Sequence, residues 1–382
     1  MNLSIFFEPV NEELAAINGT YTFGALVHCF TSKFPDWRHA QIALIGVNEW
    51  RGSLAEPPEE TPADVIRRHL FSLKQGTTAD LTIIDMGNLR PGLEVEDTYL
   101  RLKEICEMLI DHQTIPVIIG GSHDLDYGQF MAYEHLDRVI NMVSVDSRFD
   151  MEPDEDLGGN QHRFHKILMH EPNFLFSFSQ IGYQRYFVDP EMLAALEKMH
   201  FETIRLGDVH AQPEETEPVI RNADMLTFDI SAIKMQDAPA SSHTAPFGLT
   251  GEQACQLCWY AGTNDKLSSF GIYEYNPALD NRDQTAVIVA TMIWYFVEGY
   301  AHRKNETEFD KKRFVKYAVS FNDNPHKMHF YKSRQTDKWW LEVPHHSDDQ
   351  PATIVPCSYQ DYLLATKGEI PNRWMVTQAR MG

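Results

Sequence analysis

Four side chains that suit a metal ion stand just after apolar runs of this chain. These candidate ligands are His123, Asp146, Asp150 and Asp229. One imidazole and three carboxylates form a mixed nitrogen and oxygen set, which suits Mn²⁺ or a similar divalent ion better than a thiolate set would. A single aspartate after a strand is more often a turn residue, so the prediction of a metal site depends on all these positions together.

The apolar runs before these residues have the length and composition of buried strands. Runs at 41–46, 81–85, 116–119, 139–145, 176–182, 203–206, 226–230 and 269–274 alternate with helical spacing at 63–74, 95–111 and 190–199. This alternation is typical of a parallel sheet covered by helices on both faces. We therefore predict a three-layer α/β/α fold with a mostly parallel central sheet. Its carboxyl edge would carry the candidate ligands, because open α/β folds place their chemistry there.

Composition excludes several classes of partner. The chain has 382 residues, 43% of them hydrophobic, and a formal net charge of −22. Nucleic acids and anionic membranes bind basic surfaces, so we expect neither as a partner.

The five cysteines are scattered along the chain, and the pair Cys255 and Cys258 falls in a stretch of helical spacing. This pattern indicates reduced thiols rather than a redox or disulfide motif. With no export signal visible at the amino terminus, we expect a cytoplasmic protein.

Three motifs surround the candidate ligands. They are Gly120-Gly-Ser-His123, Asp146-Ser-Arg-Phe-Asp150 and Thr227-Phe-Asp-Ile-Ser231, and two further motifs are Gly159-Asn-Gln-His162 and Tyr273-Glu-Tyr-Asn-Pro277. These motifs resemble those of the ureohydrolase family of arginase, agmatinase and formimidoylglutamase. The resemblance spans roughly residues 40–300. It implies an N-terminal segment at 1–40, a ureohydrolase-like α/β domain at 41–300 and a C-terminal extension at 301–382. In that extension we predict a strand pair at 327–332 and 338–343 and a helix at 358–366.

The resemblance also implies roles for individual residues. In the family two Mn²⁺ ions share a bridging hydroxide, and the ligands carried over for one ion are His123, Asp146, Asp150 and Asp229. The other ion would need ligands at two positions that hold Arg148 and Ser231 here. Arginine has only donors and a permanent positive charge, so it cannot ligate a cation. The second metal site is therefore predicted to be incomplete.

Two states of the site stay open at this point. Either one Mn²⁺ ion lies beside Arg148, which would then polarise or orient the attacking water, or no metal binds and Arg148 is salt-bridged into the carboxylate cluster. The family pattern further implies that Asn160 and Glu274 bind the substrate, with Glu274 holding its planar cation. His162 would act as the proton shuttle.

Two functions follow from these states. The first is hydrolysis of a C–N bond in a small guanidino or formimino compound, with formimidoylglutamate the nearest family substrate. The alternative is a catalytically inactive family member that acts as a binding or assembly protein, because a fold alone does not establish activity. In either case we expect a homo-oligomer.

Overall fold

Ten strands form the central sheet of the protein, whose structure is a computed structural model. The structure describes residues 3–53, 55–78, 80–136, 138–152, 159–306, 309–310, 312–321, 324–345 and 351–381. The strands are β1 (Phe7–Glu8), β2 (Val27–Cys29), β3 (Ile42–Val47), β4 (Ile83–Leu89), β5 (Ile115–Ile119), β6 (Ile140–Val145), β7 (Leu175–Tyr183), β8 (Glu202–Arg205), β9 (Met225–Asp229) and β10 (Ser269–Tyr273). Their order is β1-β4-β3-β5-β10-β9-β6-β7-β8, with β2 also beside β4. Strand β1 runs antiparallel to β4 and the other pairs are parallel, so the predicted mostly parallel sheet is confirmed.

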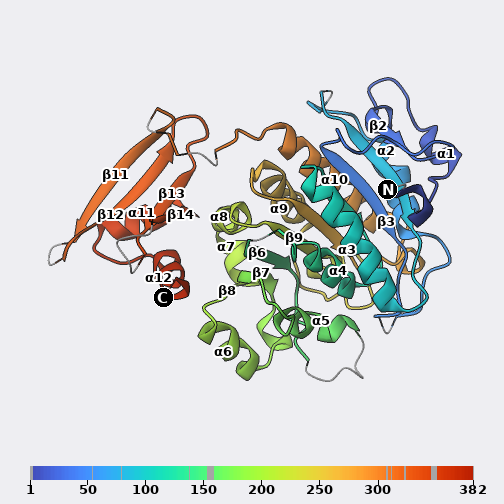
Figure 1. Ribbon diagram of the computed structural model, residues 1–382. Helices are drawn as coiled ribbons and strands as arrows, with labels where there is room; N and C mark the ends of the chain where they lie inside the picture. The colour runs from blue at the N-terminus through green and yellow to red at the C-terminus, as the bar shows by residue number, and fades with distance from the viewer. Residues whose placement is uncertain are drawn as a thin grey trace.

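Helices cover both faces of this sheet (Figure 1). They are α1 (Glu12–Ala15), α2 (Pro62–Ser72), α3 (Val95–Asp111), α4 (Asp126–Met131), α5 (Gly159–Leu168), α6 (Pro190–Lys198), α7 (Leu206–Ala211), α8 (Thr216–Arg221), α9 (Gly251–Thr263) and α10 (Gln284–Ala301). One hydrophobic core contains side chains of α2, α7, α8, α9 and α10, and the other contains side chains of α3, α4, α5 and α6. The three-layer arrangement predicted from the sequence is therefore present.

Strand β3 shows why the sheet needs both layers. All six of its residues are buried. Ile42 and Leu44 pack in the core that contains α9 and α10, whereas Ala43 and Ile45 pack in the core that contains α3. Successive side chains of a strand point to opposite faces, so a continuous apolar run can be buried only if both faces are covered.

Helix α3 shows how the local sequence sets the bounds of a helix. Its buried residues Leu102, Ile105, Cys106 and Leu109 recur at helical spacing and so form one apolar stripe. The helix begins with a reciprocal capping box between Glu94 and Asp97, which satisfies two backbone N–H groups of the first turn.

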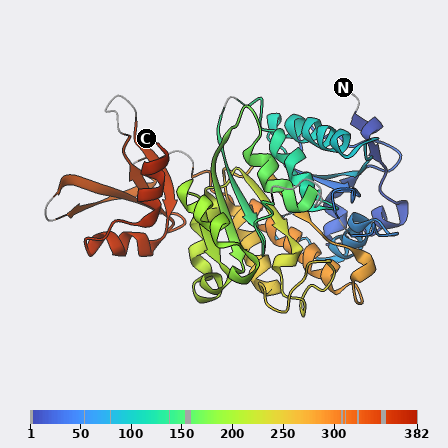
Figure 2. The ribbon, with the colours of Figure 1, turned by 90° about the horizontal axis from the view of Figure 1, so that it is seen from below.

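The C-terminal residues form a second, antiparallel sheet with its own small core. Its strands, in the order β11-β12-β13-β14, are β11 (Phe314–Phe321), β12 (Asn324–Ser333), β13 (Trp339–Val343) and β14 (Thr353–Cys357), followed by α11 (Tyr359–Thr366) and α12 (Asn372–Arg380). The predicted strand pair and the predicted helix are confirmed as β12, β13 and α11. Figure 2 shows this unit at one end of the molecule, where β14 meets α8.

Candidate metal centre

Four neighbouring strands bring the candidate residues to one edge of the sheet. Strands β5, β10, β9 and β6 are adjacent in that order. His123 begins a short 3₁₀ helix, η3 (His123–Leu125), soon after β5, and Asp229 is the last residue of β9. Glu274 follows β10 directly, and Asp146 follows β6 directly. Because the carboxyl ends of parallel strands meet at one edge, residues far apart in the sequence become neighbours.

The turn between β5 and η3 depends on glycine. A Cβ atom at Gly121 would lie 2.1 Å from the backbone oxygen of Glu49, and the next residue, Ser122, donates its N–H to that same oxygen at 2.9 Å. Only glycine lets the two backbone segments approach this closely. The glycine pair of the motif therefore positions His123.

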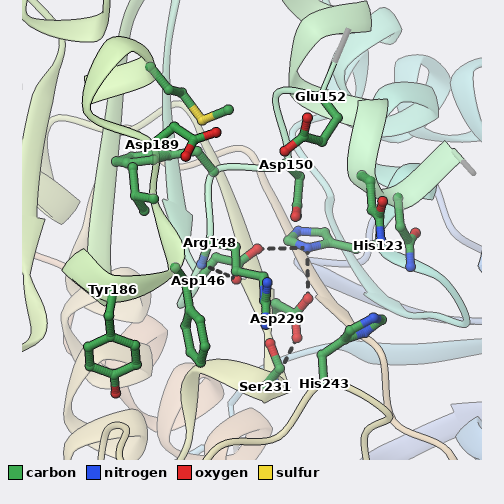
Figure 3. Close-up of a pocket in the computed structure, with 16 residues that line it drawn as sticks. His123, Asp146, Arg148, Asp150, Glu152, Tyr186, Asp189, Asp229, Ser231 and His243 are labelled. Atoms are coloured by element: carbon green, nitrogen blue, oxygen red, sulfur yellow. Dashed lines mark hydrogen bonds and ion pairs between the residues drawn. The ribbon is translucent and has the colours of Figure 1, made fainter. Parts of the chain in front are cut away.

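Two of the carboxylates are oriented by the backbone that follows them. The Oδ1 atom of Asp146 accepts the N–H of Arg148 at 3.0 Å, and the Oδ1 atom of Asp229 accepts the N–H of Ser231 at 2.6 Å. Their Oδ2 atoms consequently face His123 and lie 3.4 Å and 3.2 Å from its Nδ1 atom (Figure 3). Such turns fix an aspartate without using the oxygen that a metal would need.

The residue types and their spacing suit a divalent metal ion. His123, Asp146 and Asp150 each offer a ligand atom, and these atoms lie within 4.8 Å of one another. Neighbouring ligands of an octahedral ion with bonds of about 2.2 Å lie about 3.1 Å apart. The distances from His123 to Asp146 and Asp229 are close to that value, and Asp229 lies beside the three-residue group without belonging to it. The donor set and its spacing therefore both suit the hard cation that the sequence predicted.

Two residues of the site have a left-handed backbone that is unfavourable for residues other than glycine. The φ angles are +49° for Asp150 and +70° for Glu274. Hydrogen bonds hold both residues in place: Phe164 donates its N–H to the Asp150 backbone oxygen at 3.1 Å, and Glu274 donates its N–H to the Gly121 oxygen at 2.8 Å. Such strain persists where the surrounding structure fixes the conformation, and it is concentrated at functional sites.

The protonation of the site reflects an excess of buried negative charge. Burial and the neighbouring Asp146 raise the pKa of Asp150 to about 6, and burial and Asp229 raise the pKa of Glu274 to about 8. Burial lowers the pKa of His123, but its hydrogen bonds with Asp146 and Asp229 outweigh this effect and raise it to about 10. All three pKa values are shifted toward the protonated form, as expected where buried negative charge is in excess, so added positive charge is favourable in this site.

Arg163 on α5 is a member of the cluster that the sequence interpretation missed. Its guanidinium is fully buried and lies 2.5 Å from Asp126, 3.0 Å from Asp150 and 3.2 Å from Asp146. A signal for it does exist in the sequence. Arg163 stands three residues after Asn160 and four before Ile167, which puts it on the face of α5 that is buried against the sheet.

Arg148 lies elsewhere in the site. Its guanidinium carbon is 4.2 Å from the centre of the Phe187 ring, a cation–π contact. Among the residues that the structure describes, Arg148 forms no ion pair with a carboxylate. A guanidinium does lie in the carboxylate cluster, but it belongs to Arg163 and not to Arg148. The salt-bridged Arg148 that one of the two predicted states required is therefore not observed in this part of the chain.

A cavity of about 410 Å³ opens above the cluster. Its lining includes six of the residues predicted from the sequence: His123, Asp146, Arg148, Asp150, Asn160 and Asp229. Ser231 and the imidazole of His243 also line it, and Figure 3 shows both beside Asp229. The volume suits a small molecule.

Comparisons with known proteins assign the family. The model of the Arginase family matches residues 40–298. The chain belongs to the arginase family. It is 27% identical over 257 residues to the formimidoylglutamase of Geobacillus sp. (strain WCH70), covering 62% of this chain and 75% of the relative. It is 23% identical over 243 residues to the formimidoylglutamase of Lysinibacillus sphaericus (strain C3-41), covering 60% and 75%.

Solved structures show the same fold. The crystal structure of Trypanosoma cruzi formiminoglutamase with Mn²⁺ aligns with a TM-score of 0.65 at 19% identity, covering 71% of this chain and all of that one. The formimidoylglutamase of Bacillus subtilis aligns with a TM-score of 0.64 at 18% identity, covering 73% and 91%. These likenesses agree with the three-layer fold of this arginase-family chain.

Two predicted residues lie behind the cavity of this arginase-family protein rather than on its wall. Glu274 is 1% exposed, and its Oε1 atom accepts hydrogen bonds from the His123 N–H at 2.9 Å and from Asn160 at 2.5 Å. Its Oε2 atom has no hydrogen-bond partner among the described residues. The Nδ1 atom of His162 lies 2.7 Å from the backbone oxygen of Glu152. The roles predicted for both residues stay predictions, whereas His243 is a lining imidazole that sequence interpretation did not single out.

Proposed function

We propose that this protein hydrolyses a C–N bond in a small linear amidine, and that formimidoylglutamate is the nearest substrate class. The convergence of His123, Asp146 and Asp150 at the base of a cavity is the observation that supports it most directly. The formimidoylglutamases among the relatives favour this activity over the inactive binding or assembly protein that the sequence left as an alternative.

His123, Asp146, Asp150 and Asp229 would hold one Mn²⁺ ion in this proposal. An ion bound there supplies Lewis acidity, which lowers the pKa of water and makes a nucleophile available near neutral pH. Arg148 and Ser231 offer no carboxylate or imidazole where the family pattern would place ligands of a second ion. A single ion is therefore the state that we propose.

Arg148 suits the binding of a substrate carboxylate. Its guanidinium lies in the cavity against Phe187, and its Nε atom is buried without a hydrogen-bond partner among the described residues. Formimidoylglutamate carries its amidine on the α-nitrogen, next to the α-carboxylate, and a second carboxylate at the far end of its side chain. Arginine binds carboxylates through paired N–H groups, while the acidic side of the cavity attracts the amidinium.

Asn160 would receive that amidinium, and Glu274 would act through it. Asn160 lines the cavity and hydrogen-bonds Glu274, which lies beneath it. The carboxyl of Glu274 is buried, so it would orient Asn160 rather than contact the substrate. Proton return to the leaving amine is assigned to His162, and His243 is a second candidate because it lines the cavity.

The test combines metal content with turnover. Protein purified without chelator is analysed for bound metal, and formamide or ammonia release is then measured from N-formimidoyl-L-glutamate and a panel of amidines, with and without added Mn²⁺. One equivalent of metal together with turnover supports the proposal, and Asp229→Asn should lose both. Protein with neither bound metal nor turnover would contradict the proposal and favour the inactive binding or assembly protein.

A further inference from the structure

Arg163 contacts two of the four proposed metal ligands directly. Its Nη2 atom lies 3.2 Å from the Oδ2 atom of Asp146, and its Nε atom lies 3.0 Å from the Oδ2 atom of Asp150. The same Oδ2 atom of Asp146 faces His123 at 3.4 Å. The guanidinium therefore shares with His123 the Asp146 oxygen that would face the proposed ion, and it also holds one oxygen of Asp150.

All three nitrogens of this guanidinium are engaged. The Nη1 atom donates to Asp126 at 2.5 Å, and Nη2 also donates to the Ser144 hydroxyl at 3.2 Å. An arginine keeps its positive charge at physiological pH, and three carboxylates pair with this one. This arginine is consequently a fixed cation with no freedom to leave the cluster.

Buried carboxylates repel one another unless positive charge lies between them. Asp146 and Asp150 are such a pair, since each faces the same imidazole and the same guanidinium. Without Arg163, removal of the metal would leave these two carboxylates with no permanent positive charge paired to them in the described part of the chain. With Arg163, one permanent charge remains in place when the metal leaves.

We propose that Arg163 is a built-in cation of the metal centre. By pairing with Asp146 and Asp150 it keeps the ligands in position without metal, and by holding one oxygen of each it weakens the binding of a divalent ion. This inference rests on the ligand set of the proposed function but not on hydrolysis. If the protein shows no turnover but does show the responses described below, the proposed function is wrong and this inference still holds.

The experiment compares thermal unfolding of full-length protein after chelation and after addition of MnCl₂. The wild type should unfold cooperatively after chelation, and its unfolding temperature should rise with Mn²⁺ by the amount that ion binding gives. Arg163→Met should unfold at a lower temperature after chelation and should gain more from Mn²⁺ than the wild type does, because the ion also replaces the missing charge.

Arg67 provides a matched control. It is also a fully buried arginine that is paired with aspartates, Asp85 at 2.7 Å and Asp64 at 2.7 Å, and it lies away from the proposed ligands. Arg67→Met should lose stability and gain no more from Mn²⁺ than the wild type does. An equal gain from Mn²⁺ in both variants, or a gain in Arg163→Met no larger than that of the wild type, would overturn the inference.

Metal affinity gives an independent measurement. Titration with MnCl₂, followed by the electron paramagnetic resonance signal of the free ion, should show about tenfold tighter binding to Arg163→Met than to the wild type, because a positive charge next to the ion is removed. Equal or weaker binding would contradict the proposal. If Arg163→Met does not fold, Arg163→Lys keeps the charge with fewer donors and should show a smaller loss with partial Mn²⁺ recovery. The wild type decides the case independently, since loss of its cooperative unfolding on chelation would overturn the proposal.

Discussion

Burial decides how two arginines with the same charge act in this site. Arg163 is 1% exposed and its guanidinium pairs with three aspartates, so its charge is neutralised within the protein. Arg148 is partly exposed in the cavity and packs against an aromatic ring, so its charge is available to a ligand. The chain thus separates a cation that organises the ligands from a cation that faces the substrate.

Arg148→Met should impair binding of substrates that carry a carboxylate. Loss of a charge-assisted hydrogen bond pair costs about 1.5–3 kcal/mol, so kcat/KM for formimidoylglutamate should fall about 10- to 100-fold, chiefly through KM. A simple amidine without a carboxylate should be affected much less. Steady-state kinetics on both substrates test this. The control is Arg185→Met, which removes an exposed arginine from the same part of the chain. Equal losses on both substrates would contradict the assignment.

Restoring the residues of the family pattern should restore a second ion. The double variant Arg148→His and Ser231→Asp replaces a donor-only cation and a hydroxyl with an imidazole and a carboxylate, both of which bind Mn²⁺. The manganese content per chain, measured by elemental analysis after dialysis against MnCl₂, should rise from about one equivalent in the wild type to about two in the double variant. Each single variant should stay near one. A double variant that binds no more metal than the wild type would count against this reading of the two positions.

At the level of elements, long periodic segments could be predicted from the sequence and short edge segments could not. The predicted helix 95–111 matches α3 residue for residue, because its apolar stripe and its cap both mark it. Strands β1 and β2 went unrecognised within the segment 1–40 because they have two and three residues, too few for a period. Pairing with β4 nevertheless places this segment in the central sheet.

The same reasoning explains which part of the site could be predicted. Candidate ligands at strand ends are visible because strand, turn and polar residue follow one another in sequence. The contact of Arg163 with Asp126, Asp146 and Asp150 depends on how α5 packs over the sheet edge, a tertiary relation that no local pattern specifies. Glu274 was found by its motif, but its place behind Asn160 follows only from the fold.

The turn that positions His123 gives a prediction at this scale. Gly121→Ala would place a methyl group 2.1 Å from the Glu49 backbone oxygen, so a backbone segment must move. We expect a loss of about 3 kcal/mol in the free energy of unfolding together with weaker Mn²⁺ binding, since His123 moves with the turn. Gly207→Ala on α7 is the control, because the nearest atom to its added Cβ lies 4.0 Å away, and it should be neutral or slightly stabilising. Denaturant titration of both variants measures this difference in the free energy of unfolding.

At the scale of the molecule, buried ion pairs connect the C-terminal unit to the α/β unit. Arg373 of α12 lies 2.6 Å from Asp361 of its own unit and 3.6 Å from Glu215 beside α8. Arg221 of α8 donates to the backbone oxygens of Trp339 and Cys357 at 3.1 Å and 3.2 Å.

No helix in the described part of the chain is long and apolar enough to cross a membrane. The predicted homo-oligomer and cytoplasmic location stay predictions.

Glu217 of α8 links these two units through opposite charges. It lies 2.9 Å from Arg221 and 3.1 Å from Lys338, which precedes β13, and its side chain is 15% exposed. Burial raises the pKa of Glu217, but the two cations outweigh burial and lower it below its ordinary value. A carboxylate with a lowered folded-state pKa contributes stability above its unfolded pKa of about 4.3, and this contribution is lost as the pH falls through the folded-state pKa.

Glu217→Gln should therefore destabilise the protein in a pH-dependent manner. At pH 7 the variant leaves two cations without their partner, and we expect a loss of about 3 kcal/mol in the free energy of unfolding, monitored by denaturant titration. As the pH falls through the folded-state pKa of Glu217, the wild-type carboxylate is protonated and the difference between the two proteins should shrink. Asp208→Asn, which removes an exposed ion pair with Arg205, should cost less than about 1 kcal/mol at either pH. A difference for Glu217→Gln that stays constant with pH would show that its charge does not hold the two units together.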